Sequence, residues 1–170
     1  MKNLRNVFLI LATTLALAGL NGCTVTVTTD DSPESSHSSE GYVHESTVEW
    51  LTSPEFAEMN LPFSEAVLAG NLLFLSGQIG IVPGSGKLIS GGIGPETSQT
   101  LENIRRILEK FGSSMNRVVK CTVFLADMGE WGAMNDVYRE FFENPPARSA
   151  LGANGLALNA RVEIECIAAL

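Results

Sequence analysis

Histidine is nearly missing from this chain of 170 residues, which contains only two copies, His37 and His44. Both lie in or beside a polar stretch that precedes the segment expected to fold. No imidazole is therefore available inside that segment as a general base or as a metal ligand. Catalytic triads built on histidine are excluded for it.

Cysteine is also scarce, with three copies at Cys23, Cys121 and Cys166 and no Cys-x-x-Cys pair. A structural zinc site has no ligand set in such a chain, so we expect neither a metal nor another cofactor. Cys121 and Cys166 each occupy an apolar position in a predicted strand, and we expect both to be buried free thiols. A disulfide between them is the alternative, which export from the cytoplasm would permit.

Positively charged residues are also few, since the chain has 11 Lys and Arg residues and 19 Asp and Glu residues. The formal net charge of -8 and the pI near 4.7 repel phosphate backbones, so we expect no nucleic-acid partner. The length allows one ordinary domain with accessory segments, because a single hydrophobic core usually organises on the order of 100 to 150 residues. A second catalytic domain does not fit.

Residues 1–22 have the parts of a secretory signal. Lys2 and Arg5 precede an apolar run from Val7 to Leu20, and small or polar residues then lead to Cys23. The ending resembles the lipobox of bacterial lipoproteins, in which the cysteine is acylated after the signal is removed. The alternative is an uncleaved membrane helix, but a run of roughly 14 residues is shorter than the roughly 20 that a membrane span needs.

Residues 23–45 are rich in Thr, Ser, Asp and Glu and contain hardly any large apolar side chain. We interpret them as lipidated Cys23 followed by a flexible polar tether, because they bury too little to offset the entropy of ordering. Thr24 provides no aspartate retention signal, as the rule for such lipoproteins has it. The expected location is therefore the cell envelope. In a cell with two membranes, we expect the lipid anchor in the outer membrane and the domain facing the periplasm.

Residues 46–170 alternate between strand-like and helix-like patterns. The patterns predict two helices gathered on one face of a mixed sheet of about five or six strands, which is a single α+β domain. With no third layer available, the other sheet face favours symmetric self-association. The expected strands cover residues 64–67, 71–78, 117–127 and 161–168, with apolar side chains on both faces of the third; the expected helices cover residues 95–111 and 130–142.

Particular positions follow from these patterns. Gly70 suits the turn between the first two strands, and Gly112 ends the first helix. In the third strand, Val119 is expected on the same face as Cys121, Val123 and Leu125. In the second helix, one apolar stripe holds Trp131, Met134, Tyr138 and Phe141.

The segment from Pro83 to Lys87 is dense in turn-forming residues and superficially resembles a phosphate-binding loop. Five residues rather than four separate Gly80 from Gly86, however, and Leu88 stands where such a loop has Ser or Thr. A loop between strands is the better interpretation.

Signature-like segments occur along the domain at Pro62–Val67, Gly70–Ile79, Val118–Met128 and Pro146–Ser149 leading to Val162–Ala168. In their order and spacing they resemble the Rid (YjgF-type) family of imine deaminases. The resemblance implies a fold like that of bacterial chorismate mutases and a homotrimer with clefts between subunits.

By this resemblance, the substrates are 2-iminoacids and their enamine tautomers, which are hydrolysed to 2-ketoacids and ammonia. Arg148 matches the arginine that grips the substrate carboxylate, a task suited to a planar guanidinium. Glu163 matches the glutamate that orients the attacking water. The alternatives are an ordinary salt bridge for Arg148 and a solvated strand residue for Glu163.

Further positions match residues that line the family's cleft, although some carry a different side chain. Gly77 would let the substrate approach the backbone, or else mark a strand bulge. Phe63 stands where these deaminases commonly have tyrosine, and Ala150 where many have cysteine. The connection before Arg148 is also shorter than usual. The substrate-binding candidates are Phe63, Ser76, Gly77, Asn135, Ser149 and Ala150.

Different classes of function remain open. The first is an exported, membrane-anchored hydrolase acting on imines. The second is a non-catalytic envelope protein that binds small carboxylic acids in the same cleft. The third is a holdase or a ribonuclease, and acidity and missing histidine weigh against ribonuclease chemistry.

Overall fold

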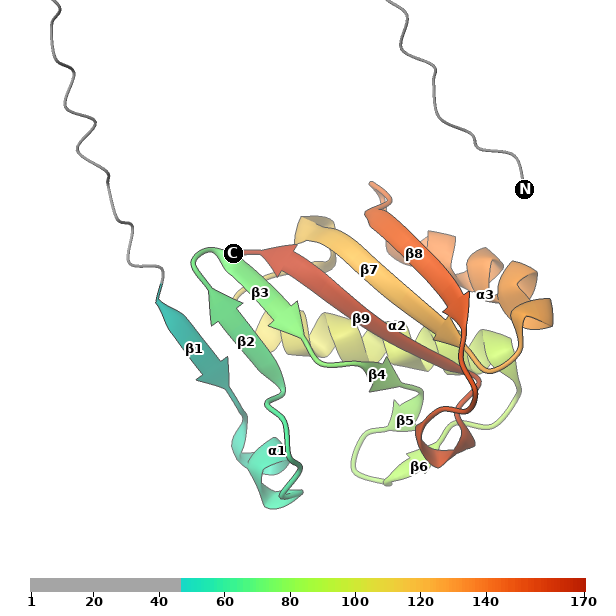
Figure 1. Ribbon diagram of the computed structural model, residues 1–170, viewed down its shortest axis with the longest axis horizontal. Coiled ribbons are helices and arrows are strands. Elements are labelled where there is room, and N and C mark those ends of the chain that lie inside the picture. The colour runs from blue at the N-terminus through green and yellow to red at the C-terminus, as the bar shows by residue number, and fades with distance from the viewer. Residues whose placement is uncertain (1–46) are drawn as a thin grey trace, which may run out of the picture. The chain divides into compact units, whose positions relative to one another are not determined.

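The computed structural model describes residues 47–170, so the predicted signal, Cys23 and the whole of the predicted tether lie outside the described residues. A seven-stranded mixed sheet forms the centre of the domain (Figure 1). Only β7 and β8 pair in parallel; every other pair in this sheet is antiparallel. In spatial order the strands are β1 (Val48–Leu51), β2 (Ala66–Ala69), β3 (Leu72–Leu75), β9 (Val162–Ala169), β7 (Val118–Leu125) and β8 (Ala147–Gly152), with β4 (Gln78–Ile79) also pairing with β9.

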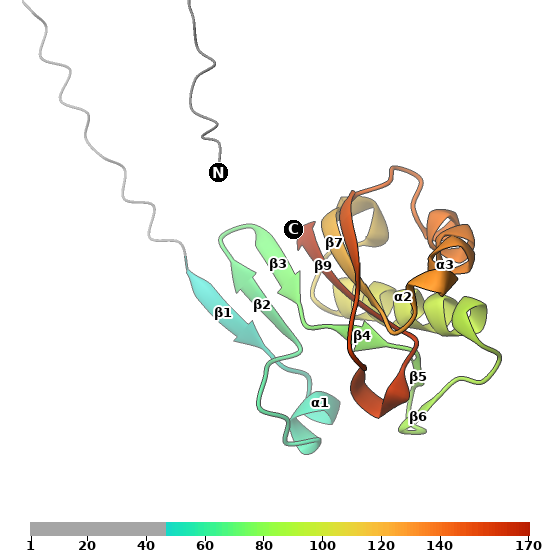
Figure 2. The same cartoon turned by 45° about the vertical axis from the view of Figure 1, so that its right-hand side comes forward.

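Two helices, α2 (Ile93–Lys110) and α3 (Trp131–Tyr138), cover one face of this sheet, as Figures 1 and 2 show. A short helix, α1 (Pro54–Glu58), follows β1, and single 3-10 turns lie at 115–117, 128–130, 139–141 and 157–159. No helix within residues 47–170 has the length and apolar character that a membrane span requires. The expected α+β fold, with helices on one face of a mixed sheet, is confirmed.

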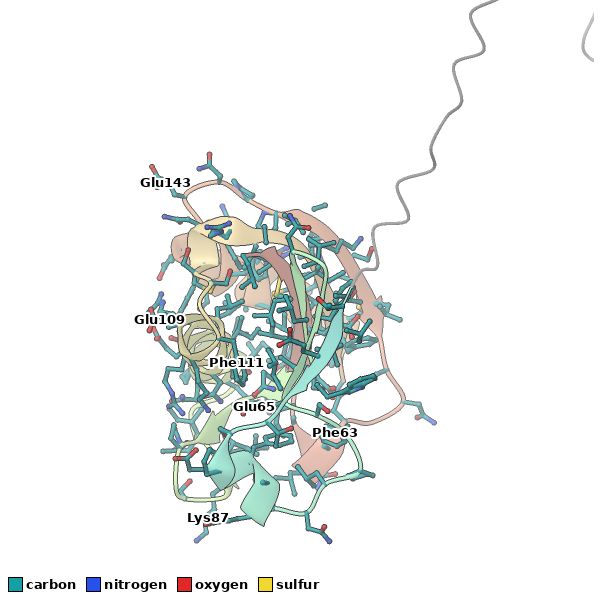
Figure 3. The ribbon with its side chains drawn as sticks, turned by 90° about the vertical axis from the view of Figure 1, so that its left-hand side faces the viewer. Phe63, Glu65, Lys87, Glu109, Phe111 and Glu143 are labelled. Carbon is teal, nitrogen blue, oxygen red and sulfur yellow. A yellow bond between two sulfur atoms is a disulfide. The ribbon has the colours of Figure 1, made fainter. Side chains whose placement is uncertain are left out.

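The core lies between the sheet and α2, and it is filled by the apolar side chains that each element turns toward the other. Val162, Ile164 and Cys166 of β9 point toward α2 and are buried, while Glu163 and Glu165 point to the other face. This alternation is what a strand with one apolar face produces. On α2 the facing stripe includes Leu101, Ile104 and Leu108, all fully buried. Figure 3 shows the helix near Glu109 and Phe111 on one side of the sheet.

Glycines set the turns that the sequence predicted. Gly70 adopts φ of +61° between β2 and β3, and Gly112 adopts φ of +85° just after α2 ends. Both conformations favour a residue without a Cβ atom. The segment from Pro83 to Gly86 joins β5 (Ile81–Val82) to β6 (Lys87–Leu88) in a hairpin, as expected.

Strand β8 was not predicted as a strand, although it carries Arg148. Its burial alternates weakly because it lies at the edge of the sheet, so periodicity gave little indication of it. Its parallel register places Arg148 opposite Cys121 of β7. Strand β1 and helix α1 were likewise not predicted.

Two predicted orientations are wrong. Val119 is 47% exposed, because the ladder between β7 and β9 shifts register between Val118 and Lys120 and turns Val118 into the core instead. Trp131 was expected on the buried stripe of its helix but is 44% exposed at the first position of α3. The described residues also leave Thr122 and Phe124 of β7 only half-buried, since nothing within them covers that face.

The expectation of free thiols at Cys121 and Cys166 is wrong, because the two cysteines form a disulfide. They face each other directly on the antiparallel strands β7 and β9, with Cα atoms 4.1 Å apart. Sequence spacing did not show this, since 45 positions separate them and only the strand register brings them together. The bridge is buried and joins two strands of the core.

Candidate functional site

Arg148 lies on the helix-covered side of the sheet, on the same face as Cys121. Its guanidinium stacks on the ring of Tyr138 of α3, with the central carbon 4.6 Å from the ring centroid. No carboxylate forms an ion pair with it among residues 47–170. Arg148 therefore keeps hydrogen-bond donors for an external acceptor, while the stacking restricts its orientation.

A pocket of about 310 Å³ opens beside this guanidinium. Tyr138 is only 6% exposed, and its hydroxyl has no hydrogen-bond partner among the described residues. Burial raises the pKa of Tyr138 to about 12, although the charge of Arg148 opposes the shift, so the phenol stays protonated at neutral pH. The pocket is lined by Asn135, Tyr138, Arg139, Phe142, Pro145, Pro146 and Arg148.

Glu163 lies on the opposite, open face of the sheet, in register with Phe124 of β7 and Ile79 of β4. Burial raises the pKa of the Glu163 carboxyl, and the nearby charge of Glu165 raises it further. A carboxyl group with a raised pKa is better matched to accepting and returning a proton near neutral pH than an ordinary surface glutamate is. Such a shift often marks a functional carboxylate.

Gly77 lies directly against this carboxylate. A Cβ atom built on Gly77 would lie 2.1 Å from Oε1 of Glu163, well inside the contact distance. A side chain at Gly77 would therefore displace the Glu163 carboxylate. This is a reason for glycine beside the two that the sequence left open, and it does not decide between them. The side-chain amide of Gln78 donates to the carbonyl oxygens of Ser76 and Gly77, each at 3.1 Å, and so fixes this segment.

Ser76 connects the Gly77 segment to the loop that carries Phe63. Its hydroxyl donates to the carbonyl oxygen of Ser64 at 2.7 Å, so within this protomer the hydroxyl is engaged with the backbone. Phe63 is 51% exposed and packs edge-to-face on Phe56 of α1, with ring centroids 5.8 Å apart. Together with α1, Phe63 lines a second hollow of about 380 Å³.

Ser149 and Ala150 point to different faces of β8. Ser149 lies on the open face, where its hydroxyl oxygen accepts a hydrogen bond from Nζ of Lys120 at 3.0 Å. Ala150 lies on the helix side and packs against the core. Only Ala150 therefore shares the face of Arg148.

The candidate residues thus form two groups. Arg148 and Asn135 meet in the pocket on the helix side, while Glu163, Gly77 and Ser76 gather on the open face. Strand β7 lies between β8 and β9. Two strand spacings therefore place the backbones of β8 and β9 about 10 Å apart. One protomer does not bring Arg148 and Glu163 together.

Tyr138 and Arg139 line the pocket, yet sequence reasoning did not propose them. Tyr138 belonged to an apolar helical stripe, whose residues are usually core, and nothing in the pattern distinguished Arg139 from a solvated helix residue. No group of three or more His, Cys, Asp or Glu side chains within residues 47–170 is arranged to hold a metal ion.

Comparison with known sequences gives a consistent result. The family model described as endoribonuclease L-PSP matches residues 55–170. A RutC family protein of Pyrococcus horikoshii is 48% identical over 108 residues, which cover 63% of this chain and 86% of that protein. A human protein named 2-iminobutanoate/2-iminopropanoate deaminase is 43% identical over 108 residues, which cover 63% of this chain and 79% of that protein.

Solved structures share the fold. A putative endoribonuclease L-PSP from Entamoeba histolytica superimposes with a TM-score of 0.63 at 39% identity, covering 65% of this chain and 89% of that one. The E. coli protein TdcF, solved with bound serine, gives a TM-score of 0.62 at 31% identity, covering 65% and 89% respectively.

Proposed function

Because the chain belongs to the Rid (YjgF) family, whose family model is described as endoribonuclease L-PSP, we propose that its domain is a hydrolytic deaminase of 2-iminoacids. In this reaction the oxygen of water adds to the imine carbon and the carbon–nitrogen bond then breaks. The products are a 2-ketoacid and ammonia. No cofactor takes part in the proposed reaction, since water and proton transfer suffice.

The observation that carries the proposal is the environment of the Arg148 side chain. Its guanidinium has no acidic partner in the described part of the chain, is held in orientation by Tyr138, and borders a pocket sized for a small molecule. A guanidinium of this kind binds a carboxylate through two parallel hydrogen bonds. Such a grip fixes the imine carbon at a defined distance from the catalytic groups.

Glu163 is the residue proposed to position the attacking water and to accept its proton. The imine is already electrophilic, so a positioned water and one proton acceptor are sufficient. The raised pKa of Glu163 allows the same carboxyl to return the proton to the departing nitrogen. The close approach of Gly77 holds the carboxylate in place.

The separation of these two residues supports a site shared between protomers. Arg148 and Glu163 face opposite sides of one sheet, so a single ligand would contact Arg148 of one subunit and the carboxylate of a neighbour. The open face, with Phe74 at 39% exposure and Ile167 half-buried, provides apolar surface for such a neighbour. We propose the homotrimer that the family resemblance implies.

The description endoribonuclease suggests a different substrate, but the charge of this chain opposes it. A net charge of -8 repels a phosphate backbone, and residues 47–170 contain no histidine to act as general acid or base. The small-acid substrate therefore accounts better for the site.

Export and membrane anchoring are part of the proposal and receive support from the disulfide. Structural disulfides form in oxidising compartments and are rare in the cytosol. The buried bridge between Cys121 and Cys166 is therefore in keeping with the secretory signal and the lipidation site proposed at Cys23. The proposed location is the outer membrane, with the domain facing the periplasm.

The proposed activity is tested with 2-iminopropanoate generated freshly by an amino-acid oxidase. The full chain should accelerate formation of the ketoacid, and Arg148→Ala should abolish the acceleration. Lys87→Gln, which removes one positive charge from the β5–β6 hairpin, is the matched control and should keep full activity. Binding of pyruvate without any turnover would favour the alternative of a carboxylate-binding envelope protein.

A further inference from the structure

The pocket beside Arg148 contains a second guanidinium, that of Arg139. Arg139 follows α3 directly, and its Nε donates to the carbonyl oxygen of Asn135 at 3.2 Å. This hydrogen bond keeps the side chain over the pocket that Asn135 also lines. Two arginines from different elements therefore border one cavity.

The only acid paired with Arg139 in the described part of the chain is Asp136, at 3.2 Å. Both side chains are largely exposed, at 71% and 76%, and exposed pairs of this kind contribute little to stability. Breaking the ion pair with Asp136 therefore costs little free energy, and Arg139 can bind an anionic ligand group in its place. Arg148 has no acid to exchange among residues 47–170.

Two cations at one pocket favour a ligand with two negative groups, because a single carboxylate leaves one of them without a counter-charge. The rest of the lining is mostly apolar, from the Tyr138 ring, Phe142, Pro145 and Pro146, and suits a short hydrocarbon link. A volume of about 310 Å³ is at the lower end of the range for ligand pockets, so the ligand is small.

We propose that the site prefers 2-iminoacids that carry a second carboxylate, the imino forms of acidic amino acids. Arg148 holds the carboxylate next to the imine carbon, and Arg139 binds the distal carboxylate. This inference rests on the proposed deaminase function and specifies its substrate class. It makes Arg139 a residue that determines specificity and leaves the chemistry to the other groups.

The test is calorimetric titration of the full chain with four ketoacids. Pyruvate and 2-oxobutanoate carry one carboxylate, while oxaloacetate and 2-oxoglutarate carry two. We expect the dicarboxylates to bind about 2- to 5-fold more tightly, a modest factor because Arg139 is exposed. Arg139→Gln should remove this difference and leave binding of the monocarboxylates within about 2-fold.

Two further variants serve as controls. Asp136→Asn removes the competing acid and should keep or increase the dicarboxylate preference. Lys87→Gln removes the same charge as Arg139→Gln at a distant place. Figure 3 shows Lys87 at the end of the domain opposite Glu143, which follows the pocket residue Phe142 in the sequence. Lys87→Gln should leave all four affinities unchanged.

The outcomes separate the two proposals. Equal affinity for both classes in the unmodified chain overturns the dicarboxylate preference and leaves the deaminase function standing. So does an Arg139→Gln variant that weakens both classes alike. Failure of every ketoacid to bind overturns the proposed function together with this inference.

Discussion

Arg148 and Glu163 project from opposite faces of the same sheet, on strands separated by β7. One ligand cannot reach both side chains within a protomer. If both act on one substrate, each site must combine the arginine of one subunit with the glutamate of the next. Under that condition, the proposed reaction requires an oligomer.

Mixing two inactive variants tests this requirement. Arg148→Ala and Glu163→Gln should each be inactive alone, but subunits that are unfolded, mixed in equal amounts and refolded together should regain activity. In a closed ring, random mixing restores about one quarter of the sites, because an intact arginine then meets an intact glutamate. Turnover of freshly generated 2-iminopropanoate is the measurement.

The control is the same procedure with Arg148→Ala alone, which should stay inactive. If both residues acted within one protomer, every subunit in the mixture would carry one defect. Mixtures that remain inactive, although they contain mixed oligomers, would contradict the shared site.

Gly77→Ala should damage activity more than stability. The new Cβ atom would overlap Oε1 of Glu163 at 2.1 Å, and the flexible carboxylate would move aside. We expect activity to fall at least about 100-fold, since displacement of a catalytic group by about 1 Å has that effect, while the urea midpoint changes little. A Gly77→Ala variant that keeps near-normal activity, or one whose urea midpoint falls in step with its activity, would show that Gly77 does not serve to place Glu163.

The major elements of the fold could be predicted because their patterns are local. The stripe of Leu101, Ile104 and Leu108 and the alternation along β9 appear directly in the sequence. Strand β8 and the disulfide could not be found this way, since both depend on which strands become neighbours. Register is a tertiary property that spacing along one strand does not contain.

The candidate site was predicted only in part, and for a related reason. The resemblance named Arg148 and Glu163, but it could not place them on opposite faces without the parallel register of β8. Tyr138 and Arg139 were missed because one is buried like a core residue and the other resembles a solvated helix residue. Their positions in the pocket depend on how α3 packs against the edge of the sheet.

Glu165→Gln should shift the pH dependence of the reaction. Burial and then the charge of Glu165 raise the pKa of Glu163, so removing that charge should lower it. A base works in its deprotonated form, so the acidic limb of kcat/KM should move to lower pH. Glu49→Gln on the edge strand β1 is the charge-matched control and should leave the limb in place. A limb that stays fixed or moves to higher pH in Glu165→Gln would exclude Glu163 as the titrating base.

Tyr138→Leu should weaken carboxylate binding, because it removes the ring that holds the Arg148 guanidinium in place. The ring of Tyr138 orients the Arg148 guanidinium from 4.6 Å, and losing a partly exposed cation–π contact should raise the dissociation constant for pyruvate about 2- to 10-fold. Tyr138→Phe keeps the ring and removes a hydroxyl that has no partner in the described residues, so affinity should be retained. Phe142→Leu, which disturbs the same aromatic pair, controls for loss of packing. If Phe142→Leu weakened pyruvate binding as much as Tyr138→Leu, Tyr138 would contribute only packing.

The disulfide should account for a substantial part of the domain's stability. Cys121 and Cys166 close a loop of 45 residues, which corresponds to about 3–4 kcal/mol through restriction of the unfolded chain. The double variant Cys121→Ala/Cys166→Ala should lower the urea midpoint accordingly, and reductant should have no further effect on it. Cys23→Ser is the matched control, because it changes the third cysteine, which lies outside residues 47–170, and should leave the midpoint unchanged. Thiol titration of denatured, unreduced Cys23→Ser protein from an oxidising compartment should find almost no free thiol. Two free thiols per chain would contradict both the bridge and its use as support for export.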